Sequence, residues 1–301
     1  MYDIIIVGAG PAGLTAAIYA RRAAKTVLVL EAASCGGQII NTPDIENYPV
    51  AMHISGLDFG NKLAAQAKEL GAEIKFERVL EIRNGESEKT VVTKKNSYSA
   101  KALILATGSE NRKLGLEGED KLVGRGVSYC ATCDGAFYRN KTVAVVGGGN
   151  TALEDALYLT DLAETVYLIH RRDEFRGEEA TVAQLREKDN LKFVFNSRVT
   201  KLNAGKRLES IEVTDKDGNA STIEVNGLFV AVGRIPENQN FANLVTLDDS
   251  GYIPAGEDCH TNVPGIFVAG DNRAKAVRQL VTATADGAVA ATEAVRYAAS
   301  H

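Results

Sequence analysis

Short apolar runs alternate along the chain with glycine-rich turns. The first run covers residues 2–10 and leads into a turn, and a second run covers residues 25–31. Residues 13–23, between them, predict a helix. Continuous apolar strands that are linked by helices are typical of parallel sheets with both faces buried. The pattern therefore predicts an α/β fold that begins with a strand, a helix and a second parallel strand.

The same strand–helix–strand pattern returns later in the chain, at an offset of 139 residues. Residues 141–149 repeat the first strand and turn, residues 150–163 repeat the helix, and residues 164–170 repeat the second strand. A repeat of this length indicates a duplicated structural unit, and a strand–turn–helix of this kind binds dinucleotides. The sequence thus predicts two Rossmann-like nucleotide-binding domains in one α/β chain.

A phosphate-binding loop is predicted between the first strand and helix. Its residues are Gly8, Gly10, Pro11, Ala12 and Gly13. The glycines permit a sharp turn, close approach of the backbone to a pyrophosphate, and tight packing of helix on strand. The helix N-terminus adds N–H groups and a partial positive charge. Glu31 ends the second strand, 23 residues after Gly8, where an acid binds ribose hydroxyls.

The second phosphate loop has a different residue at the end of its second strand. Its loop residues are Gly147, Gly149, Asn150 and Thr151. His170 stands where the first unit has Glu31, and the arginines that follow are Arg171, Arg172 and Arg176. A carboxylate there would repel a 2′-phosphate, whereas guanidinium groups bind it. We therefore expect NADP here, with a bound flavin as the other nucleotide. The alternative is a solvated charged turn.

Two of the four cysteines, Cys130 and Cys133, form a CxxC pair that is followed directly by Asp134. The pair fits a redox switch, half of a zinc site, or two inert thiols. Zinc needs two further ligands nearby, and the remaining cysteines and the four histidines are scattered, so we predict no metal site. Two adjacent nucleotide units favour thiol–disulfide exchange, with Asp134 donating or accepting the proton.

Composition narrows the classes of partner. The 301 residues carry a net charge of −5 without a large basic block, so we expect no nucleic-acid partner. Residues 4–20 carry no charge, but their clustered glycines and the preceding Asp3 argue against a signal sequence or membrane anchor. We therefore expect a cytoplasmic protein without a membrane partner, in which structural disulfides are not needed.

Taken together, these motifs resemble those of the bacterial-type low-molecular-weight thioredoxin reductases over nearly the whole chain. The shared segments, besides both loops, are GGQ at 36–38, ENYP at 46–49, ATG at 106–108, CATCDG at 130–135, HRRDEFR at 170–176 and AGDNRAKAVRQLVTATADG at 269–287. The resemblance implies an FAD-binding domain of residues 1–111 and 238–301. It also implies an NADPH-binding domain of residues 112–237 that carries the CxxC pair, and a homodimer.

The resemblance further implies that the chain reduces thioredoxin with electrons from NADPH. Hydride passes to FAD, then to the Cys130–Cys133 disulfide, and dithiol–disulfide exchange follows. Cys133 takes the electrons of the flavin, Cys130 attacks the disulfide of the partner, and Asp134 is the acid/base. The further FAD contacts that it implies are Gly36, Gly37, Gln38, Asn47, Thr107, Gly108, Asp271, Arg278, Gln279 and Leu280.

One residue departs from the family pattern, and two cysteines receive no role. Val50 follows the proline of ENYP, where many relatives have glycine. Cys35 and Cys259 are assigned no redox function. The alternatives are a related flavoprotein with another electron donor, such as ferredoxin, or with a small dithiol as substrate. A non-catalytic redox sensor is a third; the three arginines favour NADPH over ferredoxin.

Overall fold

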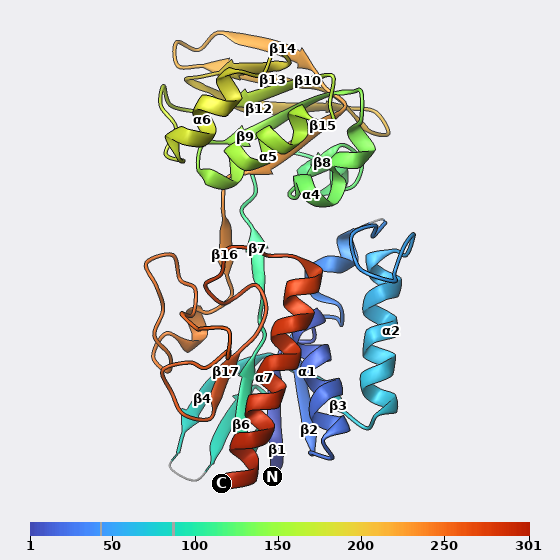
Figure 1. Cartoon of the computed structure of the whole chain (residues 1–301), viewed down its shortest axis with the longest axis vertical. Coiled ribbons are helices and arrows are strands. Elements are labelled where there is room, and N and C mark those ends of the chain that lie inside the picture. Colours follow the sequence, from blue (N-terminus) through green and yellow to red (C-terminus); the bar gives the residue numbers. More distant parts are fainter. Residues whose placement is uncertain (43, 86–87) are drawn as a thin grey trace. The chain divides into compact units, whose positions relative to one another are not determined.

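The computed structural model of the chain describes residues 1–42, 44–85 and 88–301. The chain divides into two compact units (Figure 1). The discontinuous unit comprises Met1–Glu110 and Ile235–His301, and the inserted unit comprises Asn111–Arg234. The chain passes between them at β7 (Ser109–Asn111) and β16 (Arg234–Pro236), which pair as a two-stranded sheet.

A seven-stranded sheet forms the centre of the discontinuous unit. The strands, in pairing order, are β3 (Glu73–Phe76), β2 (Val27–Glu31), β1 (Tyr2–Val7), β6 (Ser97–Leu105), β5 (Lys89–Thr93) and β4 (Val79–Asn84), with β17 (Ile266–Val268) also on β6. The pairs among β3, β2, β1, β6 and β17 are parallel. Strands β4 and β5 are antiparallel to their neighbours. The predicted parallel α/β core is confirmed.

Strand β1 is apolar throughout because each of its faces meets a separate core. Ile4 and Ile6 share one core with helices α1 (Pro11–Arg22) and α7 (Leu280–Ser300). Ile5 and Val7 share the other with β4, β5 and Phe241 of η3 (Gln239–Phe241). The three isoleucines are fully buried, and burial of each such side chain contributes roughly 1.5–3 kcal/mol. This two-sided burial fixes where β1 ends and the phosphate loop begins.

The helices of this unit begin at residues that suit helix starts. Helix α1 begins at Pro11, whose fixed φ and missing N–H are tolerated in the first turn. Helix α2 (Gly56–Glu69) follows η1 (Gly37–Asn41) and is capped by Ser55, whose hydroxyl accepts the N–H of Asp58 at 3.0 Å. Helix α7 packs on α1 so closely that a Cβ on Gly287 would lie 2.2 Å from a carbonyl oxygen of α1.

A buried ionic network holds the segment between β17 and α7. Asp286 of α7 accepts two hydrogen bonds from Arg273, at 3.0 and 3.1 Å, and one from Lys275 at 2.9 Å. The three side chains are only 6–8% exposed. Burial acts to raise the pKa of Asp286, but the bonds from Arg273 and Lys275 outweigh it and lower the pKa. The network therefore orders the loop that contains Asp271.

Asp286→Asn should lower the free energy of unfolding by about 3 kcal/mol, because it leaves the guanidinium of Arg273 buried without a charged partner. Urea-induced unfolding of the variant measures this change. The exposed pair of Glu179 with Arg186 provides the control, since Glu179→Gln should cost less than about 1 kcal/mol. Equal effects of both substitutions would contradict a structural role for the buried network.

The inserted unit has a five-stranded parallel sheet and a smaller antiparallel one. The strands of the parallel sheet, in pairing order, are β11 (Leu191–Val194), β10 (Thr165–Ile169), β9 (Thr142–Gly147), β15 (Gly227–Ala231) and β8 (Val127–Ser128). The antiparallel strands are β12 (Ser197–Ala204), β13 (Leu208–Asp215) and β14 (Ala220–Glu224). The helices are α3 (Glu119–Leu122), α4 (Ala131–Asp134), η2 (Gly135–Tyr138), α5 (Asn150–Thr160) and α6 (Glu179–Arg186).

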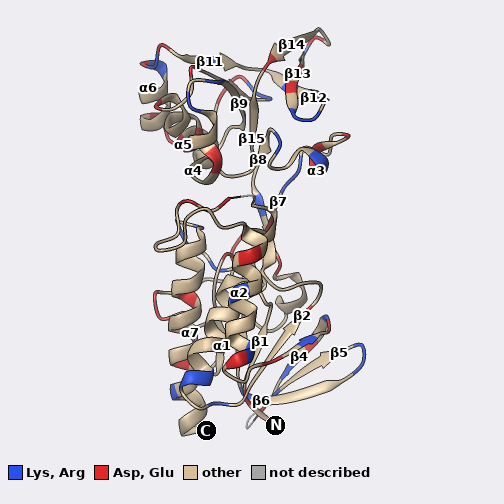
Figure 2. Cartoon of the chain, turned by 90° about the vertical axis from the view of Figure 1, so that its right-hand side faces the viewer, with Lys and Arg blue, Asp and Glu red and all other residues tan. Residues whose placement is uncertain are grey.

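The predicted internal repeat is confirmed, because β9, α5 and β10 repeat the arrangement of β1, α1 and β2. Acidic and basic residues are interspersed over both units (Figure 2). Among the described helices, none combines the length and the apolar character that crossing a bilayer requires.

Candidate active site

The first phosphate loop joins β1 to α1 in the discontinuous unit. Gly8 has a φ of +107°, and a Cβ there would lie 2.3 Å from the carbonyl oxygen of Ala106. A Cβ on Gly13 would lie 1.9 Å from the carbonyl oxygen of Gly8. Both positions therefore require glycine. The loop therefore packs tightly against the end of β6. The N-terminus of α1 forms the outer edge of the loop.

Glu31, the predicted ribose ligand, also stabilises the loop. Its carboxylate accepts the N–H of Ala9 at 2.7 Å and that of Ala33 at 2.9 Å. The carbonyl of Ala9 accepts the N–H of Gly36 at 2.8 Å, which brings the predicted GGQ segment against the loop. Because a carboxylate offers about four acceptor positions, Glu31 retains capacity for ribose hydroxyls.

Two segments that are distant in the sequence bring further predicted FAD residues together. The Nδ2 of Asn47 donates to Oε1 of Gln279 at 3.2 Å, and Gln279 is the N-cap of α7. The guanidinium of Arg278 lies 4.1 Å from the ring centre of Tyr252. Val50, in the same hairpin as Asn47, has a φ of +70°, a left-handed conformation that glycine adopts more easily than valine.

A third segment follows β6 and includes Thr107 and Gly108. The Oγ1 of Thr107 accepts a hydrogen bond from Asn272 at 3.1 Å, and Asn272 follows Asp271 directly. The Nε of Arg278 is buried, and the described residues offer it no partner. A buried N–H without a partner fits an acceptor atom of a bound nucleotide. The residues of this unit therefore fit FAD.

The second phosphate loop joins β9 to α5 in the inserted unit. Gly149 caps α5, and Oδ1 of Asn150 accepts the N–H of Glu178 at 2.8 Å. His170 is only 5% exposed and lies under this loop, because a Cβ on Gly148 would come 2.1 Å from its ring. Burial and the nearby Arg172 and Arg176 lower its pKa, against opposing backbone hydrogen bonds. His170 thus supports the loop from below.

The three arginines after β10 are exposed. Within the part of the chain that the structure describes, the guanidinium groups of Arg171, Arg172 and Arg176 have no ion-pair or hydrogen-bond partner. Arg172 and Arg176 lie close enough to His170 to influence its pKa. The backbone N–H of Arg176 donates to the carbonyl of Gly148 at 2.7 Å, so this arginine segment lies beside the phosphate loop. Exposed guanidinium groups in such a segment suit a 2′-phosphate. The inserted unit therefore fits NADPH.

The CxxC pair lies in the inserted unit and is joined as a disulfide, as a redox pair requires. The Cα atoms of Cys130 and Cys133 are 5.3 Å apart. Cys130 is the N-cap of α4, which contains Cys133, and the carbonyl of Cys130 accepts the N–H of Asp134 at 3.1 Å. A single turn of helix therefore sets the spacing that permits this disulfide to open and close.

Asp134 is the last residue of α4 and is half-buried. The hydroxyl of Ser128 donates to its Oδ2 at 2.6 Å. Burial raises the pKa of Asp134, although the bond from Ser128 opposes the shift. A carboxyl that retains its proton to higher pH suits an acid that protonates a leaving thiolate.

The two remaining cysteines are free thiols with raised pKa values. Cys259 is buried, which raises its pKa to about 12, and Cys35 is half-buried, which raises its pKa as well. Both thiols are therefore largely protonated at neutral pH. Protonated thiols are poor nucleophiles in disulfide exchange.

Asp155 of α5 was not singled out from the sequence, because a lone acid in a helix carries no motif. The structure brings it beside the CxxC turn, where it interacts with the backbone N–H of Ala131. Burial and the neighbouring Glu154 raise its pKa to about 7, against the opposing effects of Arg234 and Ala131. A carboxyl with a pKa of about 7 therefore lies next to the CxxC turn, in addition to Asp134.

Asp155→Asn should weaken the dependence of the free energy of unfolding on pH. A raised pKa in the folded state favours folding at low pH, and this contribution is lost as pH rises from about 4 to above about 7. The difference in the free energy of unfolding between the variant and the wild type should therefore favour the variant by about 2 kcal/mol more at pH 8 than at pH 4. This value is reduced because Asp155 is partly exposed. Unfolding in urea at both pH values measures it. Asp161→Asn, at the exposed C-terminal end of the same helix, is the control and should keep the wild-type pH dependence; a wild-type slope in Asp155→Asn would contradict the assignment.

Comparison with known proteins agrees with this geometry. The family model for pyridine nucleotide-disulphide oxidoreductases matches residues 2–287. The thioredoxin reductase of Listeria monocytogenes is 45% identical, over 99% of this chain and 94% of that protein. The thioredoxin reductase of Bacillus subtilis is 42% identical, over 99% and 95%.

A solved structure agrees as well. The crystal structure of thioredoxin reductase from Streptococcus pyogenes is 39% identical, covers 100% of this chain and 99% of that chain, and superposes with a TM-score of 0.95. Two phosphate loops, a CxxC disulfide and full-length similarity agree with one another. The chain belongs to the pyridine nucleotide-disulphide oxidoreductases and, among them, to the thioredoxin reductase family.

Proposed function

We propose that the chain is an NADPH-dependent thioredoxin reductase. The reaction converts NADPH, a proton and an oxidised thioredoxin into NADP⁺ and a dithiol thioredoxin. The observation that carries the proposal is that the Cys130–Cys133 disulfide lies in the same unit as a phosphate loop followed by three exposed arginines, which make no ion pair within the described residues. Full-length similarity to thioredoxin reductases supports it.

The discontinuous unit is proposed to hold FAD. The loop from Gly8 to Gly13 would receive the pyrophosphate, Glu31 the ribose, and the Asn47–Gln279 pair with Arg278 the flavin end. When bound, a flavin accepts hydride from NADPH and supplies two electrons to the disulfide. The role of the protein is to orient the bound flavin. The partial positive charge at the N-terminus of α7 would stabilise negative charge on the reduced flavin.

The inserted unit is proposed to hold NADPH. The loop of Gly147, Gly149, Asn150 and Thr151 would bind the pyrophosphate at the N-terminus of α5. Arg171, Arg172 and Arg176 would bind the 2′-phosphate. His170 would act by supporting the loop, since its ring fills the space beneath Gly148.

The dithiol chemistry uses three side chains. Cys133 accepts the electron pair as the disulfide opens, and Cys130 leaves as a thiolate. Asp134 donates a proton to that thiolate and later removes it, a role that its raised pKa favours. The Cys130 thiolate then attacks the disulfide of thioredoxin. Cys133 resolves the mixed disulfide, so the Cys130–Cys133 bond forms again and thioredoxin leaves as a dithiol.

Steady-state oxidation of NADPH with the thioredoxins of the host tests the proposal. We expect turnover that saturates with thioredoxin and is much slower with NADH. Reduced ferredoxin should not replace NADPH, because the arginines provide a 2′-phosphate site. Activity with ferredoxin alone would favour the related flavoproteins with another donor. Flavin reduction without turnover on any thioredoxin would favour a redox sensor.

We also propose a homodimer that works in the cytoplasm, as the family resemblance implies. Light scattering of the FAD-loaded enzyme at micromolar concentration should give twice the mass of the chain. A monomer that retains full thioredoxin reductase activity would contradict the dimer.

A further inference from the structure

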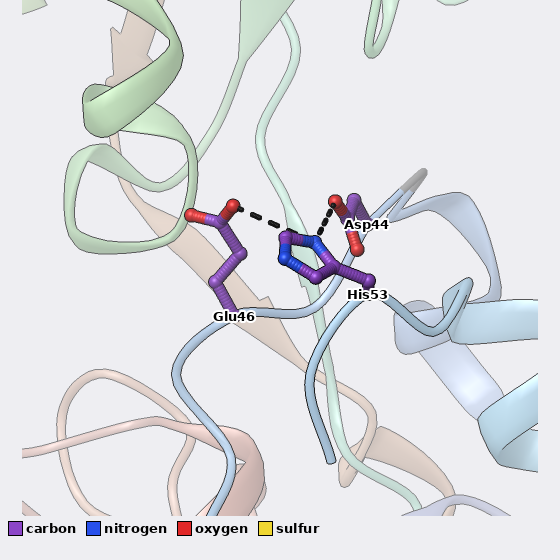
Figure 3. Close-up of side chains that lie close together, drawn as sticks. All are labelled: Asp44, Glu46 and His53. Atoms are coloured by element: carbon purple, nitrogen blue, oxygen red, sulfur yellow. Dashed lines mark hydrogen bonds and ion pairs between the residues drawn. The ribbon is translucent and has the colours of Figure 1, made fainter.

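The hairpin between η1 and α2 brings together three side chains of metal-ligand type. They are Asp44, Glu46 and His53, and their ligand atoms all lie within 4.8 Å of one another (Figure 3). The Nδ1 of His53 is 3.2 Å from Oδ2 of Asp44 and 4.0 Å from Oε1 of Glu46. Figure 3 shows the imidazole between the two carboxylates, with one ring nitrogen facing both. Three potential ligands therefore converge on one point.

Backbone hydrogen bonds fix the positions from which these side chains extend. Gly56 donates to Thr42 at 2.9 Å, and Ile45 donates to Ile54 at 2.9 Å. Ile45 and Ile54 form an antiparallel bridge, and Ile45 is only 2% exposed. Each bridge residue is the direct neighbour of a ligand residue, Asp44 on one arm and His53 on the other. These backbone hydrogen bonds therefore hold the two arms of the hairpin in register, with or without a ligand on the side chains.

The charges at this point favour a cation. Among the described residues, His53 is the only positively ionisable group that forms an ion pair with Asp44 or Glu46. In a tetrahedral zinc site with bonds of about 2.0–2.1 Å, ligand atoms lie about 3.3 Å apart. The distance between Nδ1 of His53 and Oδ2 of Asp44 already fits this value. The carboxylate of Glu46 comes to the same distance when its exposed side chain rotates.

We propose that Asp44, Glu46 and the Nδ1 of His53 bind one zinc-class divalent cation, with water completing the coordination. One imidazole and two carboxylates suit zinc and its neighbours, whereas magnesium and calcium prefer oxygen ligands alone. The sequence did not predict this site, because the spacing D-x-E-x6-H matches no metal motif. The hairpin also carries Asn47, which bonds to Gln279, so the ion would restrain the segment from which Asn47 extends.

Calorimetric titration of the full chain with Zn²⁺ tests the site directly. The FAD-loaded enzyme is first treated with a chelator, and the Cys130–Cys133 disulfide is kept oxidised so that these thiols do not bind zinc. We expect one zinc per chain with a dissociation constant in the micromolar range or below. Absence of binding at about 100 μM zinc would overturn the proposal.

Matched variants locate the site. His53→Ala should weaken zinc binding by roughly 100-fold and Glu46→Gln by roughly tenfold, because each removes one ligand. His260→Ala and Cys35→Ser are the controls. His260 is another exposed histidine, and it lies 3.3 Å from the carboxylate of Glu293; Cys35 is the half-buried free thiol. Both controls should bind zinc as tightly as the wild type. Wild-type affinity in both His53→Ala and Glu46→Gln, or loss of binding in His260→Ala, would overturn the proposal.

Discussion

Cys133→Ser should abolish NADPH-driven reduction of thioredoxin, by at least roughly 10⁴-fold, while reduction of the flavin by NADPH persists. The reason is that the Cys130–Cys133 disulfide is the proposed acceptor of electrons from the flavin, and serine cannot form a disulfide. Cys130→Ser should have the same effect, because the thiol that attacks thioredoxin is then lost. Stopped-flow absorbance of the flavin measures the first half-reaction, and steady-state turnover measures the whole.

Cys35→Ser provides the matched control for these variants, since Cys35 is a free thiol outside the CxxC pair. It should retain both half-reactions. Loss of flavin reduction in both Cys130→Ser and Cys133→Ser would show that the roles of the two cysteines are misassigned. Turnover at the wild-type rate in either variant would contradict a dithiol mechanism.

Arg171→Ala combined with Arg172→Ala should raise the KM for NADPH by roughly 1,000-fold and change the KM for NADH little. Each guanidinium is expected to form a charge-assisted hydrogen bond to the 2′-phosphate worth about 1.5–3 kcal/mol. NADH lacks that phosphate, so it loses nothing when the arginines are removed. Measurement of kcat and KM with NADPH and with NADH, at fixed thioredoxin concentration and ionic strength, distinguishes loss of 2′-phosphate recognition from a general loss of nucleotide binding.

Arg198→Ala, in β12 of the same unit, is the control for non-specific loss of positive charge, because Arg198 is also exposed. It should leave the preference for NADPH unchanged. Equal changes in the KM for NADPH and NADH in the double variant would refute recognition of the 2′-phosphate by Arg171 and Arg172.

Sequence reasoning predicted those features that depend on local patterns. The two strand–turn–helix units follow from apolar runs and glycine spacing, and Gly8 and Gly13 occupy positions where the structure leaves no space for a Cβ. The CxxC spacing predicted the disulfide for the same reason, since one helical turn sets the separation of Cys130 and Cys133. Local geometry leaves a signature in the sequence that is short and easy to recognise.

Features that depend on tertiary packing were not predicted. The position of His170 under its loop, rather than at the surface beside the arginines, follows from the packing of β10 against the second phosphate loop. The raised pKa of Asp155 follows from burial beside the CxxC turn. The convergence of Asp44 and His53 depends on the register of a hairpin, and no spacing rule encodes that register.

In the proposed reaction, electrons from NADPH reach the Cys130–Cys133 disulfide. Anaerobic mixing of the oxidised, FAD-loaded enzyme with excess NADPH, followed by alkylation and mass spectrometry, tests it most directly. We predict that Cys130 and Cys133 become alkylated after NADPH and are protected without it, while NADH at the same concentration gives little labelling. Reduction of the flavin by NADPH with Cys130 and Cys133 still joined would contradict the account.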